Sequence, residues 1–306
     1  MTGAIIVQAN PVLETVDLAV QCRTASGKLD LLQGIHLRLE AGRVLGIVGE
    51  SGSGKSLTCH AILGLLHRTQ MQRSGQVRLQ GQELTNYSER QMRRVRGAQI
   101  GTILQNPMNA FMPLHTIGTQ FVQTLRTHDG TLSRRQALRM AVEGLDNMGL
   151  PHPQRLLRQY PFQLSGGMLQ RIMIALSMCL KPKLLIADEP TTALDLVSQL
   201  QVLRALDRLR RECGTAILLV SHDLGVIAQM ADDVAVMRHG RIVEQGSVHQ
   251  LFDDPQHEYT RLLLDSRMTA YHPLEQEQEQ EQEQEQEQEQ EQEQEQEQEQ
   301  GGRRDA

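Results

Sequence analysis

The sequence has 306 residues, of which 39% are hydrophobic and 22% are charged. This length and composition suit one large globular domain or two smaller ones with a substantial core. No apolar run reaches the ~18 to 20 residues of a membrane-spanning helix, and the N-terminus lacks signal-peptide features, so we expect a cytosolic chain. The four cysteines form no CxxC pair, which argues against a zinc ribbon or a disulfide framework.

The formal net charge of −6 is set by one segment, because residues 275–300 consist of thirteen Glu-Gln pairs. Without those thirteen negative charges the remainder of the chain carries a net charge of +7. This mildly basic charge is compatible with phosphate ligands or an anionic surface, but it is only weak evidence for them. The tract has no apolar side chain to bury. We therefore predict a disordered, low-complexity tail over 275–300.

In chain order, the pattern predicts strands first and then strands alternating with helices. Residues 3–48 consist of short alternating runs, followed by a glycine-rich loop and a helix. A second strand-rich patch leads to the apolar run "AQIGTILQNP", and residues 109–167 have helical spacing. Further helices then alternate with the strands "KLLIADEP" and "TAILLVSHD". This order predicts an α/β fold with a parallel sheet and an inserted helical subdomain.

The segment "GESGSGKS" fits the P-loop pattern, with an apolar strand before it and a helix after it. Small residues let backbone N–H groups surround phosphates, and the helix N-terminus adds positive potential. Lys55 would neutralise the β and γ phosphates, and the Ser56 hydroxyl would hold Mg²⁺. The predicted phosphate-binding residues are Gly49, Glu50, Ser51, Gly52, Ser53, Gly54, Lys55 and Ser56.

The segment "LLIADEP" delivers two adjacent acids at the end of a short apolar strand. Ligands of α/β sheets bind at that end of the strands. Asp188 would reach Mg²⁺, and Glu189 would act as general base toward the attacking water. The alternative for this pair alone is a solvated acidic turn.

The segment "LSGGMLQR" opens a helix with Ser165, Gly166 and Gly167, which leaves N–H groups and a hydroxyl to bind an anion. A simple helix cap is the alternative. With this segment the sequence resembles the ATP-binding subunits of ABC transporters. In that family two ATP-binding domains pair head to tail, so that the signature segment of one completes the site formed by the P-loop of the other.

The resemblance covers about residues 4–272 and implies a RecA-like P-loop NTPase core with an antiparallel β subdomain and a helical subdomain at about 107–170. It implies ATP and Mg²⁺ as cofactors. Gln105 in "ILQNP" matches the Q-loop glutamine, a ligand of Mg²⁺ that also senses the attacking water. Asp195 in "TTALD" matches the D-loop, and His222 in "LLVSHD" matches the switch histidine at the γ phosphate.

One departure from the family concerns the adenine. Members usually stack it on an aromatic residue in the N-terminal strand region, whereas this chain has no Phe, Tyr or Trp before Tyr87. Cys22 occupies roughly that place. Weaker ATP binding, or reliance on aliphatic contacts, is the expected consequence.

Three segments indicate which branch of the family this chain resembles. The segments "SLTCHAILGLL", "QNPMNAFMPLHTIGTQ" and "DDPQHEYTRLLL" resemble those of peptide and nickel importers. In the last segment, Glu258 replaces a proline of the C-terminal motif of that branch. The resemblance of these short segments favours a role in nickel(2+) uptake, and a dipeptide or oligopeptide importer is the alternative. The ATPase subunit does not touch the cargo in this family. His152, His249, His257 and His272 are accordingly not interpreted as nickel ligands, since no pair has metal-ligand spacing on a helix.

The resemblance further implies a second ATPase subunit that pairs head to tail with this chain as a heterodimer. It also implies two transmembrane permease subunits, and a periplasmic binding protein that acts indirectly. It implies a peripheral position on the cytoplasmic face of a bacterial inner membrane, and no nucleic acid partner. A soluble ABC ATPase of DNA or ribosomes is a rival, but coiled-coil insertions, zinc cysteines and a second ATPase domain are missing. A non-hydrolysing subunit is another rival, although every expected chemical group is present.

Overall fold

The computed structural model describes residues 11–25, 27–67, 69–192 and 194–265. Contacts divide the chain into two units, Met1–Gln256 and His257–Ala306. In the second unit, residues 258–265 are helical. The predicted tail at 275–300 and both ends of the predicted span 4–272 lie outside the described residues, so these boundaries stay predictions. The fold described below is that of the first unit.

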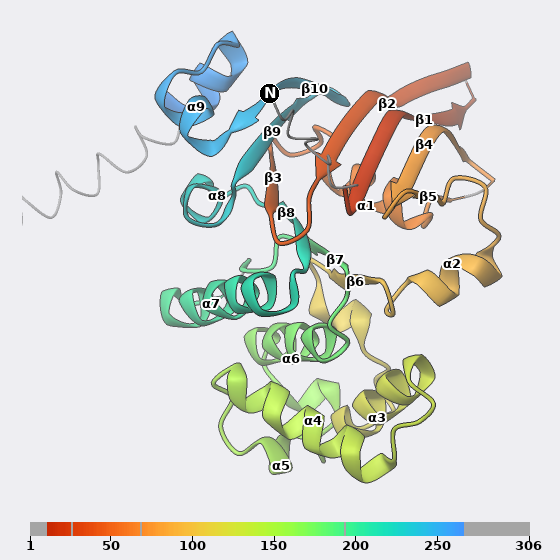
Figure 1. The fold of residues 1–306 in the computed structure, drawn as a ribbon, viewed down its shortest axis with the longest axis vertical. Coiled ribbons are helices and arrows are strands. Elements are labelled where there is room, and N and C mark those ends of the chain that lie inside the picture. Colours follow the sequence, from red (N-terminus) through yellow and green to blue (C-terminus); the bar gives the residue numbers. More distant parts are fainter. Residues whose placement is uncertain (1–10, 26, 68, 193, 266–306) are drawn as a thin grey trace, which may run out of the picture. The chain divides into compact units, whose positions relative to one another are not determined.

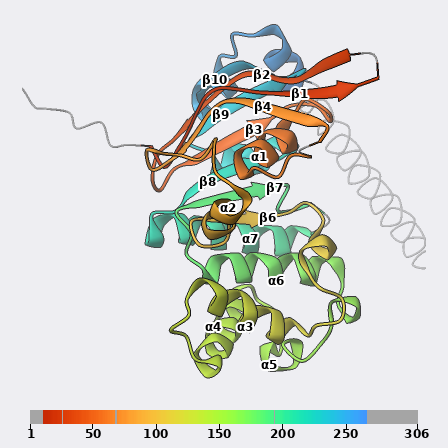
Figure 2. The same cartoon turned by 90° about the vertical axis from the view of Figure 1, so that its right-hand side faces the viewer.

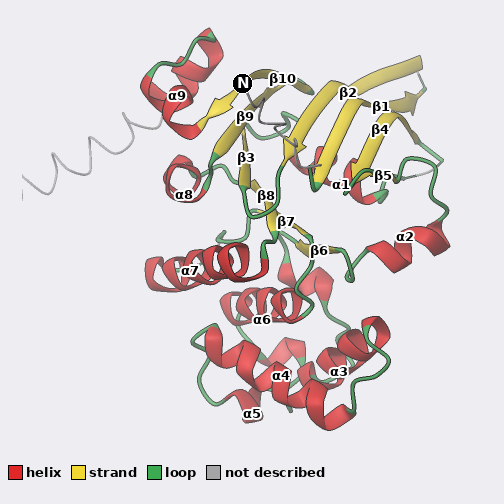
Figure 3. Ribbon diagram, viewed as in Figure 1, coloured by secondary structure: helices red, strands yellow, loops and turns green. Residues whose placement is uncertain are grey.

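Four strands form an antiparallel sheet in the order β2-β1-β4-β5 (Figure 3). In the register of this sheet, Leu13 lies opposite both Leu39 and Leu79, and all three side chains are buried. Alternation of buried and exposed residues along β1 and β2 gives the sheet one apolar face. The strands are β1 (Leu13–Thr24), β2 (Gly27–Leu39), β4 (Met71–Leu79) and β5 (Gln82–Glu83).

Six strands form a second sheet in the order β10-β9-β3-β8-β7-β6. Its pairs are parallel except for the edge strand β10, which runs antiparallel to β9. All residues of β3, β7 and β8 are buried, as continuous apolar runs require in a sheet covered on both faces. The strands are β3 (Val44–Val48), β6 (Ile100–Ile103), β7 (Leu184–Asp188), β8 (Ala216–Val220), β9 (Asp233–Arg238) and β10 (Arg241–Ser247).

Helix α1 (Lys55–Leu63) packs between the two sheets, because one buried cluster contains side chains of α1 and of both sheets. Helices α6 (Gly166–Cys179) and α7 (Leu196–Cys213) lie on the opposite face of the six-stranded sheet (Figures 1 and 2). The parallel sheet is thus covered by helices on both faces, which is the P-loop NTPase arrangement predicted from the sequence.

A group of helices inserted between β6 and β7 extends away from the sheets (Figure 1). Its two longest members begin at side-chain caps, Thr116 before α3 and Ser133 before α4. The group comprises η1 (Pro107–Ala110), α3 (Ile117–His128), α4 (Arg134–Asn147), α5 (Pro153–Leu156) and η2 (Pro161–Gln163). Its limits as a subdomain, about 107–170, stay a prediction.

Three short helices complete the described fold: α2 (Glu89–Val95), α8 (Leu224–Met230) and α9 (Val248–Asp253). Among the described residues, no helix is long and apolar enough to span a bilayer.

Candidate ATP site

Strand order places the predicted site residues at one edge of the parallel sheet. In register, Ile47 of β3 and Asp188 of β7 both lie beside Val220 of β8, and Ile103 of β6 lies beside Ala187. The four strands therefore end at the same level. The segments that carry Lys55, His222, Glu189 and Gln105 begin at that edge.

The glycine-rich loop after β3 turns sharply, with glycine at the positions that a side chain could not occupy. Gly49 has φ 149°, and a Cβ there would lie 2.2 Å from the carbonyl oxygen of Met237. Gly54, with φ 109°, is the N-cap of α1 and offers no side chain to the first-turn N–H groups. Those N–H groups at a helix N-terminus form an arrangement that binds anions.

Polar groups of the loop are buried within it. The Lys55 side chain is 8% exposed, and its Nζ donates to the carbonyl oxygens of Gly49 and Glu50, each at 2.8 Å. Ser53 Oγ is buried without a hydrogen-bond partner among the described residues. Because buried hydroxyls are nearly always satisfied, Ser53 indicates a polar ligand at this loop.

Ser56 and Asp188 meet between α1 and β7, where Ser56 Oγ donates to Asp188 Oδ1 at 3.2 Å. Asp188 is 8% exposed, and burial is the main cause that raises the pKa of its carboxyl above the ordinary value of 3.8. The hydrogen bond from Ser56 and the positive charge of Lys55 act in the opposite direction. A hydroxyl and a carboxylate oxygen thus face one another, which is the donor set that Mg²⁺ prefers.

Glu189 is where three of the predicted segments converge. Its Oε2 accepts hydrogen bonds from Gln105 Nε2 at 3.3 Å and from Thr192 Oγ1 at 2.8 Å, and it lies 3.0 Å from His222 Nδ1. The side chain is 15% exposed, whereas that of His222 is 49% exposed. No described residue donates to Oε1, the second oxygen of Glu189.

The signature segment is placed away from the P-loop of its own chain, since the parallel strands separate α6 from α1 (Figures 1 and 2). Ser165 caps α6 by accepting from the N–H of Met168 at 3.3 Å. A Cβ on Gly166 would meet no atom within 4 Å, so the backbone there is open to a ligand. Gly167 follows in the same first turn.

Asp195 caps α7, with its carboxylate accepting from the N–H of Ser198 at 2.9 Å and from the Ser198 hydroxyl at 2.7 Å. These bonds lower the pKa of Asp195.

Cys22 lies near the end of β1, where it pairs in register with Leu29 of β2. Three residues after Leu29, Leu32 of the same strand contacts the P-loop, because a Cβ on Gly54 would lie 2.8 Å from Leu32 Cδ2.

Two residues at this site escaped the sequence-based prediction of individual roles. Thr192 belongs to the segment "TTALD" and has no predicted role of its own, although its position three residues after Glu189 is compatible with a turn that folds its hydroxyl back. The carbonyl oxygen of Met237 leaves no room for a side chain at Gly49, although the two residues are nearly 190 positions apart in the sequence. No local sequence pattern predicts this contact.

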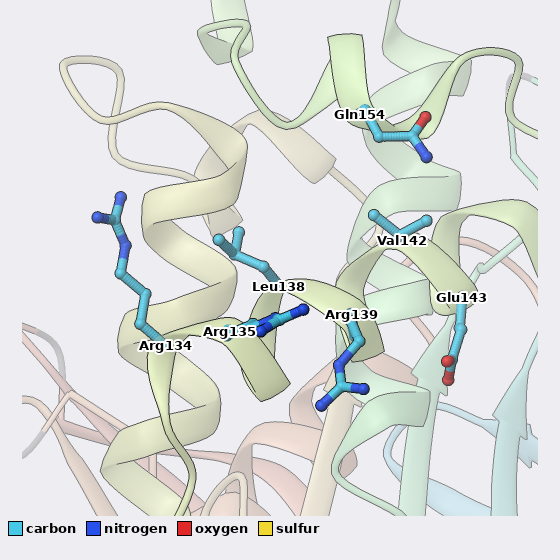
Figure 4. Close-up of a pocket in the computed structure, with 7 residues that line it drawn as sticks. All are labelled: Arg134, Arg135, Leu138, Arg139, Val142, Glu143 and Gln154. Atoms are coloured by element: carbon cyan, nitrogen blue, oxygen red, sulfur yellow. The ribbon is translucent and has the colours of Figure 1, made fainter.

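A separate groove of about 680 Å³ lies on α4, lined by the apolar side chains of Leu138 and Val142 and by Arg134, Arg135 and Arg139 (Figure 4). None of the predicted site residues lines it.

Among the described residues, no group of three or more His, Cys, Asp or Glu side chains is arranged to hold a metal ion.

Comparison with known proteins assigns the fold. The chain resembles the ATP-binding cassette MJ0796, solved as a dimer bound to ADP and Pi, with TM-score 0.70 and 24% identity over 77% of this chain and 98% of that one. It also resembles cbiO1 from Clostridium perfringens, with TM-score 0.66 and 25% identity over 80% of this chain and 92% of that one.

Curated relatives are similar over most of the chain. The oligopeptide transport ATP-binding protein OppD of Bacillus subtilis is 42% identical over 89% of this chain and 76% of its own length. A probable peptide ABC transporter ATP-binding protein of Sinorhizobium fredii is 45% identical over 85% and 78%. The glutathione import ATP-binding protein GsiA of Salmonella paratyphi A is 43% identical over 83% and 41%.

Some relatives are much longer than the matched region, since the chain spans 42% of the OppD of Mycobacterium tuberculosis. The family profile described as ABC transporter matches residues 32–192, a segment that includes the P-loop, Gln105, the signature segment and Glu189. The chain therefore belongs to the ABC transporter family, as an ATP-binding subunit that hydrolyses ATP.

Proposed function

We propose that this chain is the ATPase subunit of a peptide-type ABC importer and that Glu189 is its general base. The observation that carries the proposal is the convergence of Gln105, Thr192 and His222 on one oxygen of Glu189, beside the Ser56–Asp188 pair. These groups come from four segments far apart in sequence. Their meeting at the carboxyl edge of the sheet supports nucleotide chemistry over an acidic turn.

The P-loop residues 49–56 would hold the phosphates of ATP. The N–H groups of the first turn of α1 have no side-chain cap, and the buried Ser53 hydroxyl has no hydrogen-bond partner among the described residues; both support this role. The Lys55 ammonium supplies positive charge within the loop. Ser56, Asp188 and Gln105 would hold Mg²⁺, and the oxygen donors of Ser56 and Asp188 fit it. When bound, the ion neutralises charge on the phosphate oxygens.

The hydrolytic step would use the free oxygen of Glu189. With Oε2 engaged by neighbouring donors, Oε1 is the atom available to take a proton from water as it attacks the γ phosphate. His222 and Gln105 would contact the γ phosphate and the water. Both are exposed enough to move there, since His222 is 49% exposed and Gln105 lies at the surface.

A second ATPase subunit would complete the site. Ser165, Gly166 and Gly167 present an open helix start that lies away from the chain's own P-loop, so they would bind the ATP held by the partner subunit. Next to Asp195, Leu196 is 70% exposed and Val197 is 67% exposed. Exposed apolar side chains at this place support a surface that faces another protein.

The assembled importer would contain two such subunits, two transmembrane permease subunits and a periplasmic binding protein that delivers cargo. This chain would lie peripherally on the cytoplasmic face of the inner membrane. Partners that differ in sequence, giving a heterodimer of ATPases, remain part of the proposal.

Peptides are the proposed cargo. The relatives reported above are named for oligopeptide, peptide or glutathione transport, and this favours the peptide alternative over the nickel assignment that phrase resemblance suggested. The preference for nickel therefore finds no support in these relatives.

The test is ATP turnover by this subunit in lipid vesicles that contain the permease pair and the binding protein encoded with it. We expect binding protein loaded with di- or oligopeptides to raise the rate of phosphate release, and nickel-loaded binding protein to leave it unchanged. Stimulation by nickel alone would restore the nickel assignment and overturn the peptide one. An absence of ATP turnover with every cargo would contradict the ATPase role in an importer.

A further inference from the structure

The backbone at Glu189 adopts an unusual conformation. Its φ is +49°, in the left-handed region that non-glycine residues seldom occupy. The Glu189 N–H donates to the carbonyl oxygen of Val220 at 2.9 Å, which ties this backbone to the end of β8. The direction in which the side chain leaves the sheet is thereby set, but its carboxylate still needs an anchor.

The three groups around Glu189 Oε2 differ in how they are attached to the fold. Gln105 follows β6 and His222 follows β8, and the proposed reaction needs both of them at the nucleotide. Thr192 belongs to the turn that Glu189 begins, where its N–H also bonds to the Glu189 carbonyl oxygen at 3.3 Å. Its hydroxyl makes the shortest of the three contacts, 2.8 Å.

We propose that Thr192 is a positioning residue for ATP hydrolysis: its hydroxyl holds Glu189 Oε2 so that Oε1 is presented to the attacking water. The proposal rests on the proposed role of Glu189 as general base. Thr192 can keep its bond when Gln105 and His222 turn to the nucleotide, because the bond lies within one turn of the chain. Without it, the carboxylate would be free to rotate away from the water, and small misplacements of this kind cost rate.

The experiment compares three variants in the assembled importer. Thr192→Val keeps the shape of the side chain and removes the hydroxyl, whereas Thr192→Ser keeps the hydroxyl and removes the methyl group. Thr192→Ala serves as a second hydroxyl-free variant should valine disturb folding. We measure kcat and KM for ATP, with equilibrium ATP affinity as evidence that the site is intact.

We expect Thr192→Val and Thr192→Ala to lower kcat about tenfold while ATP affinity stays within about twofold of the parent, and Thr192→Ser to retain kcat within about twofold. In single-turnover reactions, Thr192→Val should add less than about a twofold loss to a Glu189→Gln background, because the oxygen being positioned no longer accepts the proton.

Equal losses with valine and serine, or an undiminished kcat with valine and alanine, would overturn the positioning role. So would a full additional loss in the Glu189→Gln background. If Glu189→Gln itself hydrolyses ATP normally, the general base assignment fails and the role of Thr192 falls with it. An inactive Glu189→Gln beside a fully active Thr192→Val would refute Thr192 alone.

Discussion

Cys22 is the residue at which this chain departs from the expected adenine site. It lies on β1 beside Leu29, a side chain that is 54% exposed, and β2 continues from there to the P-loop. We predict that Cys22→Tyr tightens ATP binding by fivefold or more, since stacking of a base on an aromatic ring contributes ~1 to 3 kcal/mol. Equilibrium binding of ATP and ADP would measure the change.

Cys22→Leu is the matched control, because it adds apolar area without an aromatic face. Its affinity should stay within about twofold of the parent. Equal affinity for the tyrosine variant and the parent would place the adenine elsewhere.

Asp188 makes the stability of the folded protein depend on pH. Its pKa is raised in the folded protein, mainly by burial, so folding favours the protonated form. That contribution to stability is complete below pH 3.8 and is lost as pH rises through the raised pKa. At pH 7, without nucleotide, the raised pKa of this carboxyl therefore corresponds to a loss of stability.

We predict that Asp188→Asn raises the Tm of the nucleotide-free protein at pH 7 and that the gain shrinks toward pH 4. We expect the Tm to rise by roughly 2 to 4 °C for each ~1 kcal/mol gained in unfolding free energy. Asparagine can still accept the Ser56 hydrogen bond, so the local contact is kept. A variant less stable than the parent at pH 7, yet equal to it at pH 4, would contradict the assigned cause.

At the residue scale, the identity of the site could be predicted from the sequence but its geometry could not. The P-loop, Asp188 and Glu189 follow from local patterns, because each stands at the boundary of a strand or helix. The convergence on Glu189 Oε2 does not, since it depends on the φ of Glu189 and on segments up to 117 residues apart. Thr192 is only three residues from Glu189, but its contact depends on that positive φ, which the sequence pattern does not indicate.

At the scale of elements, the N-termini of α4 and α6 provide a matched pair. Ser133 accepts from the N–H of Gln136 at 3.2 Å, and Ser165 accepts from the N–H of Met168 at 3.3 Å. We predict that Ser133→Ala and Ser165→Ala each lose about 1 kcal/mol of unfolding free energy, because each removes one cap. Thermal or denaturant unfolding would measure both.

Only Ser165→Ala should also lower ATP turnover in the assembled importer, by about tenfold, because only α6 is proposed to meet the partner's nucleotide. Equal turnover in the two variants would mean that Ser165 is a cap and nothing more.

Which elements could be predicted follows from their length and from the range of their contacts. The apolar runs of β3, β7 and β8 and the spacing of α3 and α4 are local signals, and these elements form where expected. Helix α2 has only seven residues, too few for a periodic pattern to reveal it. Strand order was not predictable either, because β8 lies between β3 and β7 only through pairing of distant segments.

At the scale of the whole molecule, the single chain holds apart the two segments that are proposed to form the two halves of an ATP site. The P-loop and Glu189 lie at one edge of the sheet, and the open start of α6 lies on the other side of the parallel strands. Under the proposed function, hydrolysis would therefore depend on the assembly, whereas proton transfer would depend on Glu189 of this chain.

The most direct test of the account is ATP affinity and phosphate release by the assembled importer carrying Glu189→Gln in this chain, with its second ATPase inactivated in the corresponding way. Glutamine keeps the size of the side chain and can accept from Thr192, but it cannot take the proton of water. We predict ATP affinity within about twofold of the parent and phosphate release reduced by about a hundredfold or more. Phosphate release at the parental rate would remove Glu189 as general base and contradict the account.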